Sequence, residues 1–197
     1  MTPNEFFDEI FVINLDRRAD RWQQISASLD ELGIKATRIP AIDGQAIGIT
    51  GVTASRMSHL IPLLIAKDKH LGRILVLEDD AIFSHDFLDG FADVIDNLPP
   101  SWDMFYLGAN TGSITPTDNP RLWKTSGAVA IHAIAYNNRV FDNCIDIATT
   151  TTAVLDLAYY WEHPALEAYI VRPYLVTQSD GHSDLLNVEV NYSDIIQ

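Results

Sequence analysis

The stretch Arg73-Ile74-Leu75-Val76-Leu77-Glu78-Asp79-Asp80 decides the expected fold, because an uninterrupted apolar run passes directly into three carboxylates. A strand that is apolar on both faces is typical of a sheet covered by helices on both sides. Ligands of such sheets bind outside the carboxyl ends of the strands. The three carboxylates are therefore expected at the ligand-binding edge of an α/β sheet.

The acidic cluster of Glu78, Asp79 and Asp80 has more than one physical explanation. Two carboxylates about 4 Å apart repel by roughly 4 kcal/mol at an effective dielectric constant near 20. The cluster is therefore well solvated, partly protonated or bound to a metal. A metal explains why all three carboxylates follow a strand at the expected binding edge. The alternative is that Asp79 or Asp80 caps a helix and the others are solvated.

The pattern on both sides of this stretch alternates between strand and helix, which predicts one α/β domain over residues 1–197 with a mainly parallel sheet flanked by helices. Residues 108–125 lack periodicity and are rich in Asn, Thr, Gly, Ser and Pro, which predicts a long loop. Strands are expected at residues 10–15, 34–39, 73–77, 103–107, 128–136 and 168–172, and helices at residues 18–32, 54–70, 85–98, 140–148 and 153–161.

Composition narrows the classes of function. The 197 residues, 47% of them apolar, suffice for one core, and the net charge of −14 argues against nucleic acid as a partner. The single cysteine, Cys144, excludes an internal disulfide and a thiolate zinc cluster. No apolar run reaches the roughly 20 residues of a membrane helix, and the acidic start is unlike a signal peptide. We therefore expect a soluble, cytoplasmic protein.

Arginines follow the first expected strand, at positions 17, 18 and 21. Cations at a helix N-terminus oppose its dipole by up to about 1 kcal/mol each, so this placement suggests a function. An arginine fork suits a phosphate, and Asn14 could read the edge of a base or a ribose. The alternative is that Asp16 and Asp20 pair with these arginines on a solvated surface.

Two further polar groups are expected at loop ends. Asp43 can accept hydrogen bonds from ribose hydroxyls, and Gly44 permits a tight turn. Ser58 and His59 belong to the first turns of the next helix, whose free N–H groups suit an anion. Thr53, in the same segment, is more simply explained as a helix N-cap.

Histidines could complete a metal site. His182 lies in a polar segment beyond the last strand and is the preferred candidate, whereas His132 lies in an apolar strand, as a core histidine does. The chain lacks the glycine motifs of dinucleotide and P-loop sites and the serine elbow of α/β-hydrolases.

The order of these motifs is similar to that of a known family. The run at residues 11–18, the segment at 41–44, Ser58-His59-Leu60 and the run at 75–81 follow one another, with Leu155-Asp156 and Ser183-Asp184 later in the chain. Together they resemble glycosyltransferase family 25, the lipopolysaccharide-biosynthesis and procollagen-galactosyltransferase family, over residues 8–187.

The resemblance implies a GT-A fold, which is Rossmann-like, a UDP-sugar donor, and a divalent metal, Mn²⁺ or Mg²⁺, held by the Glu-Asp-Asp motif. In this chain Asp80 would ligate the metal, with Glu78 and Asp79 supporting it or touching the ribose. The residues expected around the donor are Asn14, Arg17, Arg18, Asp43, Gly44, Ser58, His59, Glu78 and Asp79, and the expected metal ligands are Asp80, Glu78 and His182.

The family inverts the sugar, which implies a carboxylate that takes the proton of the acceptor hydroxyl. Asp156 is the first candidate for this base and Asp184 the second. We therefore expect a metal-dependent, inverting glycosyltransferase that moves galactose or glucose from a UDP-sugar to a glycan acceptor. A catalytically silent nucleotide-sugar-binding module and a magnesium-dependent phosphotransfer domain are the alternatives.

Overall fold

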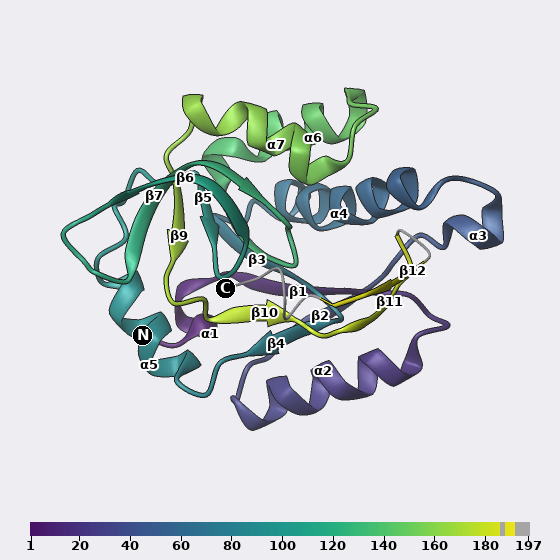
Figure 1. Cartoon of the computed structure of the whole chain (residues 1–197), viewed down its shortest axis with the longest axis horizontal. Helices are drawn as coiled ribbons and strands as arrows, with labels where there is room; N and C mark the ends of the chain where they lie inside the picture. Colours follow the sequence, from purple (N-terminus) through teal and green to yellow (C-terminus); the bar gives the residue numbers. More distant parts are fainter. Residues whose placement is uncertain (186–187, 192–197) are drawn as a thin grey trace.

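The computed structural model describes residues 1–185 and 188–191. Its centre is an eight-stranded sheet with the strand order β2-β1-β3-β8-β5-β9-β7-β6 (Figure 1). The strands are β1 (Glu9–Asn14), β2 (Thr37–Pro40), β3 (Arg73–Glu78), β5 (Met104–Tyr106), β6 (Asn110–Pro116), β7 (Leu122–Val129), β8 (Ala133–Asn137) and β9 (Ala168–Val171).

The sheet is mixed. Strand β1 pairs in parallel with β2 and β3, and β5 pairs in parallel with β9. The pairings β3–β8, β5–β8, β7–β9 and β6–β7 are antiparallel. The predicted α/β class is confirmed, and the sheet is mixed because β7 and β8 run against their neighbours.

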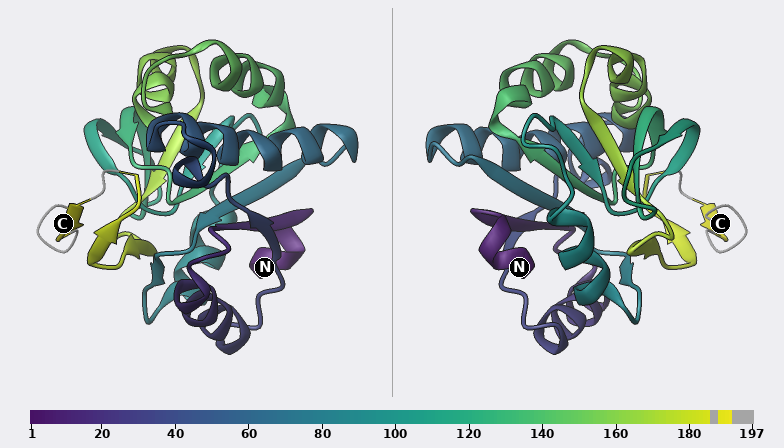
Figure 2. Two further views of the ribbon diagram at one scale, coloured as in Figure 1. Left: turned by 90° about the vertical axis from the view of Figure 1, so that its right-hand side faces the viewer. Right: turned by 90° about the vertical axis from the view of Figure 1, so that its left-hand side faces the viewer.

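Helices cover both faces of the sheet, as the apolar strand predicted (Figure 2). Ile74 and Val76 of β3 pack into the core beneath α4, α6 and α7, whereas Leu75 and Leu77 pack into the core shared with α1, α2 and α5. The helices are α1 (Pro3–Phe6), α2 (Ala19–Glu31), α3 (Gly44–Ile47), α4 (Gly51–Asp68), α5 (Phe87–Ile95), α6 (Phe141–Thr150) and α7 (Leu155–Glu162), with the 3-10 turns η1 (Asn138–Val140) and η2 (His163–Ala165).

The segment predicted as a long loop, residues 108–125, forms strand β6 and the first half of β7, so that prediction was wrong. Gly112 and Gly127 lie against the ring of Tyr160 from α7, and a Cβ on Gly127 would come within 2.4 Å of that ring. Helix α7 therefore packs closely on this hairpin. The single strand expected at 128–136 is also divided, by a turn in which Ala130 has a φ of 72°.

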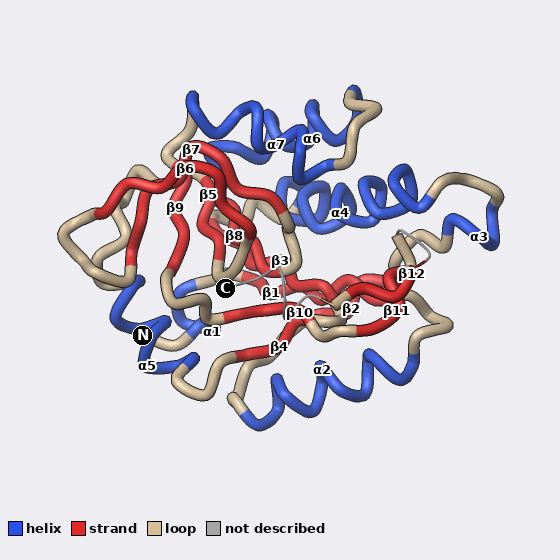
Figure 3. The backbone as a smooth tube through the Cα atoms, in the orientation of Figure 1, coloured by secondary structure: helices blue, strands red, loops and turns tan. Residues whose placement is uncertain are grey.

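Two short strand pairs complete the described chain (Figure 3). Strand β4 (Ala81–Phe83) continues the acidic run and pairs with β10 (Val176–Gln178), and β11 (Gly181–Ser183) pairs with β12 (Val188–Val190). Across residues 1–185 and 188–191, no helix combines the length and the apolarity needed to cross a membrane.

Candidate functional site

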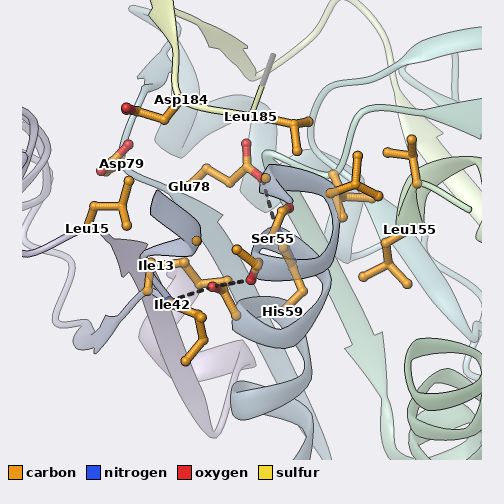
Figure 4. A pocket seen from close by; sticks show the side chains of 18 of the residues that line it. Ile13, Leu15, Ile42, Ser55, His59, Glu78, Asp79, Leu155, Asp184 and Leu185 are labelled. Carbon is orange, nitrogen blue, oxygen red and sulfur yellow. Dashed lines mark hydrogen bonds and ion pairs between the residues drawn. The ribbon is translucent and has the colours of Figure 1, made fainter. Parts of the chain in front are cut away.

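A cavity of about 790 Å³ lies at the carboxyl ends of β1 and β3. Side chains from β1, α4, β3 and the segment that carries Asp184 converge on it (Figure 4). Ten of the thirteen residues proposed from the sequence line the cavity: Arg17, Asp43, Gly44, Ser58, His59, Glu78, Asp79, Asp80, Asp156 and Asp184. The lining does not include Asn14, Arg18 and His182.

The acidic cluster lies beside β1 because Ile13 and Glu78 are partners in the parallel ladder. Asp79 accepts hydrogen bonds from Asn14 Nδ2 at 2.6 Å and from Arg21 Nη1 at 3.1 Å. Burial raises the pKa of Asp79, although Asn14 and Arg21 oppose the shift. This carboxylate is thus oriented by two donors and still destabilised in its charged form.

Asp80 is the most buried of the three carboxylates, with 8% of its surface exposed. Gln178 Nε2 and Arg21 Nη1 approach its oxygens only to 3.5 Å. Burial, followed by the charge of Glu78, raises the pKa of Asp80 to about 7. A buried carboxylate with weak partners suits a cation, since a cation would offset both desolvation and repulsion.

Glu78 is joined to helix α4 by His59, whose Nε2 lies 2.9 Å from Oε1 of Glu78. Burial would raise the pKa of Glu78, but the hydrogen bond and charge of His59 outweigh it, so the pKa falls below its usual value. Ser58, one residue earlier, accepts from the backbone N–H of Ile42 at 2.8 Å and donates to the Ala54 carbonyl. Ser58 therefore fixes the loop after β2 on α4.

Arg17 and Arg18 are both bound to carboxylates. Arg17 donates from Nε to Asp43 at 2.8 Å and from Nη1 to Asp184 at 2.7 Å. Arg18 donates from Nη1 to Asp184 at 2.8 Å and pairs with Asp20 through Nε and Nη2. The surface pairing considered as an alternative is thus present for Asp20, yet Asp184 joins both guanidinium groups at the rim of the cavity.

Asn14 and Asp43 are engaged inside the fold. Asn14 is buried, donates to Asp79, and accepts from Arg38 Nε and Nη2 at 2.9 and 2.7 Å. Asp43 caps α3 by accepting from the N–H groups of Gln45 and Ala46. Asn14 therefore orients the carboxylate of Asp79, and Asp43 stabilises the loop that leads into α3.

Gly44 is required by a close approach. A Cβ at this position would lie 2.8 Å from the carbonyl oxygen of Ile49 and 3.0 Å from Cβ of Ala54. The tight turn expected at Gly44 thus brings the start of α3 against the start of α4.

Asp156 enters the cavity from the first turn of α7. Its Oδ2 accepts from the backbone N–H of Ala130 at 3.0 Å, and its Oδ1 accepts from Leu157 N–H at 2.7 Å. Ala130, with its left-handed φ, also lines the cavity. Each carboxylate oxygen has a second lone pair, so both can accept a further proton or hydrogen bond.

His182 lies outside the acidic cluster. Its Nδ1 is 3.4 Å from Glu189 Oε1, and 41% of its side chain is exposed. Only its backbone carbonyl approaches the site, by accepting from Arg21 Nη2 at 2.8 Å. In the described part of the chain, no three His, Cys, Asp or Glu side chains form a ready metal cage. A Mg²⁺-type ion does not need one, since it is usually held by one or two carboxylates together with phosphate oxygens and water.

Arg21, Gln178 and Arg38 were not among the proposed site residues. Arg21 donates to Asp79, reaches toward Asp80 and donates to the backbone carbonyl of His182, so it is an arginine in direct contact with the acidic cluster. The sequence could have indicated Arg21 as a site residue, because it belongs to the same group of arginines as Arg17 and Arg18. Arg38 and Gln178 reach the site through β2 and β10, and only the three-dimensional pairing of these strands reveals them.

Comparison with curated proteins tests the resemblance directly. Human "Procollagen galactosyltransferase 2" is 30% identical over 129 residues, which cover 52% of this chain and 21% of that protein. About half of this chain is therefore similar to members of glycosyltransferase family 25. Human "Inactive glycosyltransferase 25 family member 3" is 31% identical over the same shares, and a Drosophila melanogaster "Glycosyltransferase 25 family member" is 26% identical over 127 residues, 51% of this chain and 21% of that protein.

The family 25 relatives are much longer than the present chain, which spans about a fifth of their length. No family model matches the chain. A solved glycosyltransferase involved in the glycosylation of the major capsid of PBCV-1 covers 82% of this chain, and 80% of that protein is covered, at 10% identity and a TM-score of 0.50. At this identity the likeness concerns the fold alone. The similarity to family 25 that the motifs predicted is confirmed.

Proposed function

We propose that this chain is a divalent-metal-dependent, inverting glycosyltransferase domain that transfers galactose or glucose from a UDP-sugar to a glycan acceptor. The observation that carries the proposal is the acidic cluster Glu78, Asp79 and Asp80, with Arg21 beside it, at the rim of a cavity of about 790 Å³. That volume lies within the roughly 300–1,000 Å³ of small-molecule sites. The similarity to family 25 supports the reaction class.

In this proposal the donor lies between the acidic cluster and the start of α4. Asp80 and Glu78 are the ligands for Mn²⁺ or Mg²⁺, because Asp80 is buried with only distant donors. When bound, the metal supplies positive charge that stabilises the departing diphosphate. Arg21, which donates to Asp79 and reaches toward Asp80, adds a fixed positive charge at the same edge.

Asp156 is the proposed base. A proton passes from the acceptor hydroxyl to a carboxylate oxygen of Asp156 while that hydroxyl oxygen forms a bond to the anomeric carbon. The bond between the anomeric carbon and the diphosphate breaks, and its electron pair leaves with the UDP. The backbone N–H groups of Ala130 and Leu157 hold the carboxylate in place. Leu155 and Leu157 also line the cavity beside Asp156.

A catalytically silent nucleotide-sugar-binding module is the second candidate, and two observations favour keeping it. Both oxygens of Asp156 already accept a backbone hydrogen bond, so an acceptor hydroxyl would share this carboxylate with the N–H groups of Ala130 and Leu157. A related human protein is named an inactive member of family 25.

The test is a panel of nucleotide sugars with the purified protein, with and without Mn²⁺. A thermal shift identifies the donor, since a ligand at 100 times its dissociation constant stabilises a protein by about 2.7 kcal/mol. UDP release that requires Mn²⁺ supports the enzyme, and Asp156→Asn should abolish release while retaining the thermal shift. A thermal shift without release supports the silent module. Phosphoryl transfer without preference for a nucleotide sugar would instead support a phosphotransfer domain.

A further inference from the structure

The segment 179–185, here called the strap, is held by all three arginines of the β1–α2 loop. Arg17 and Arg18 each donate to one oxygen of Asp184, at 2.7 and 2.8 Å. Arg21 donates to the backbone carbonyl of His182 at 2.8 Å. The guanidinium N–H groups that would suit an anionic ligand are therefore already hydrogen-bonded to the strap.

The strap also rests on the first residue of α4. A Cβ added to Gly51 would lie 2.6 Å from the carbonyl oxygen of Leu185 and 3.2 Å from its Cα. Asp184 and Leu185 both line the cavity (Figure 4). The strap thus meets the cavity at two points, the pair of arginines and the N-terminal end of α4, where backbone N–H groups favour negative charge.

The charges of this network argue that an anion cannot simply be added to it. Arg17 and Arg18 carry two positive charges, and their partners Asp20, Asp43 and Asp184 carry three negative charges. An incoming diphosphate would meet an excess of negative charge at close range. Of the three carboxylates, only Asp184 binds both arginines. Movement of Asp184 away from this position would therefore free one N–H donor on Arg17 and one on Arg18.

We propose that Asp184 is a built-in competitor of the anionic part of the ligand, and that the strap must leave Arg17 and Arg18 before a diphosphate binds them. The inference rests on the proposed function only in naming UDP as the natural carrier of that diphosphate. In the closed state Asp184 fills the anion position and Leu185 covers the start of α4. In the open state the diphosphate replaces the carboxylate on both guanidinium groups.

The first experiment measures the affinity for inorganic pyrophosphate and for UDP by titration calorimetry. Asp184→Asn keeps the shape of the side chain but cannot offer a charged acceptor, so both affinities should rise by about tenfold or more. Asp16→Asn is the matched control, because Asp16 lies in the same loop and its partner is Arg38. An equal gain in Asp16→Asn, or no gain in Asp184→Asn, overturns the proposal.

The second experiment follows hydrogen exchange in the parent protein. On addition of UDP and Mn²⁺, exchange in residues 179–185 should rise while exchange in the first turn of α4 falls. Slower exchange in the strap would mean that it closes over the ligand, which overturns the proposal. Gly51→Ala, whose Cβ displaces Leu185, should raise pyrophosphate affinity in the same direction as Asp184→Asn.

These outcomes separate the inference from the proposed function. If the protein releases UDP in the presence of Mn²⁺ but Asp184→Asn does not bind pyrophosphate more tightly, the proposed glycosyltransferase function stands. The proposed competition by Asp184 is then rejected. If Asp184→Asn binds pyrophosphate more tightly but no nucleotide sugar yields UDP, the proposed competition by Asp184 stands. The proposed glycosyltransferase function is then rejected.

Discussion

His59 Nε2 lies 2.9 Å from Glu78 Oε1, and this hydrogen bond joins the third turn of α4 to the end of strand β3. His59 is buried, and its Nδ1 has no partner among the described residues. His59 therefore uses Nε2 to orient the carboxylate of Glu78.

Replacing His59 with alanine should leave Glu78, which lines the cavity, without that donor. The expected loss is about 1–3 kcal/mol of unfolding free energy, the usual cost of an unsatisfied buried partner. Urea unfolding at pH 7 measures it. His85→Ala, at an exposed histidine, is the control, and equal stabilities of the two variants would contradict the assigned role.

Asp80→Asn should abolish metal-dependent UDP binding without unfolding the protein. The pKa of Asp80 is higher in the folded chain than the ordinary 3.8, so the folded state binds the proton more tightly. The parent therefore loses stability as the pH rises from about 4 to 7, by roughly 4 kcal/mol at most. The variant, which cannot titrate there, should be at least as stable as the parent at pH 8 without metal.

The test of Asp80→Asn combines UDP titrations with and without Mn²⁺ and chemical unfolding at pH 8. Asp89→Asn, at an exposed position of α5, provides the control. Mn²⁺-dependent UDP binding equal to that of the parent would remove Asp80 from the metal site.

Replacing both Arg17 and Arg18 with alanine should weaken UDP binding by about 1.5–3 kcal/mol, because a hydrogen bond to a charged group contributes that much. The loss should be similar for UDP and for the complete donor. It should also persist at high ionic strength, since contacts within a cleft are screened less than surface pairs. Titration calorimetry at low and high salt decides whether these arginines contact the nucleotide. Lys124→Ala is the control, because it also removes a positive charge but at a residue whose partner is Glu167.

His163 predicts an acid-sensitive step in stability away from the cavity. It accepts from the backbone N–H of Ala128 through Nδ1 at 3.2 Å, so the proton is on Nε2, which lies 2.8 Å from the hydroxyl of Tyr106. Burial lowers the pKa of His163 from 6.5 to about 4. Between these values the unfolded chain binds the proton and the folded chain does not, so stability falls as the pH falls from 6.5 to 4.

The expected loss from His163 is about 3 kcal/mol over that window, since one pKa unit corresponds to about 1.4 kcal/mol. Urea unfolding of the parent and of His163→Gln at pH 7 and at pH 4.5 isolates this contribution, because the opposite pH dependence expected from Asp80 is common to both proteins. His163→Gln should be less stable than the parent at pH 7, and the difference between the two should shrink toward pH 4.5. A difference that stays constant between the two pH values would assign the acid sensitivity to other groups.

Much of the fold could be predicted because, in the first half of the chain, the local sequence pattern agrees with the helices and strands that form. The apolar run ending at Leu77 implies helices on both faces, and Gly33, with a φ of 66°, directly follows the helix expected at residues 18–32, where a left-handed glycine commonly ends a helix. The second half could not be predicted in this way. Strand β6 is an edge strand rich in Thr, Ser and Gly, so it lacks a continuous apolar face, and Tyr160 of the distant helix α7 packs against Gly112 of β6 and Gly127 of β7.

The candidate site was predicted best where a strand end determines the position of a side chain. Glu78, Asp79 and Arg17 follow parallel neighbours in the sheet, so they had to meet at one edge. Asp156 and Asp184 were identified only through the family resemblance, because no local pattern brings α7 or the strap to that edge. The contacts of Arg17 and Arg18 with Asp184 were hidden for the same reason, whereas the pairing of Arg18 with Asp20 was among the expected alternatives.

The contact between Arg17 and Asp184 joins residues that are 167 positions apart in the chain. Contacts of such separation carry the largest loop-closure entropy and form late in folding. During synthesis, β1, the arginine loop, α4 and β3 emerge long before the strap. A newly made chain therefore presents its two arginines and its acidic strand end uncovered, and the mouth of the cavity is among the last parts to acquire its native form.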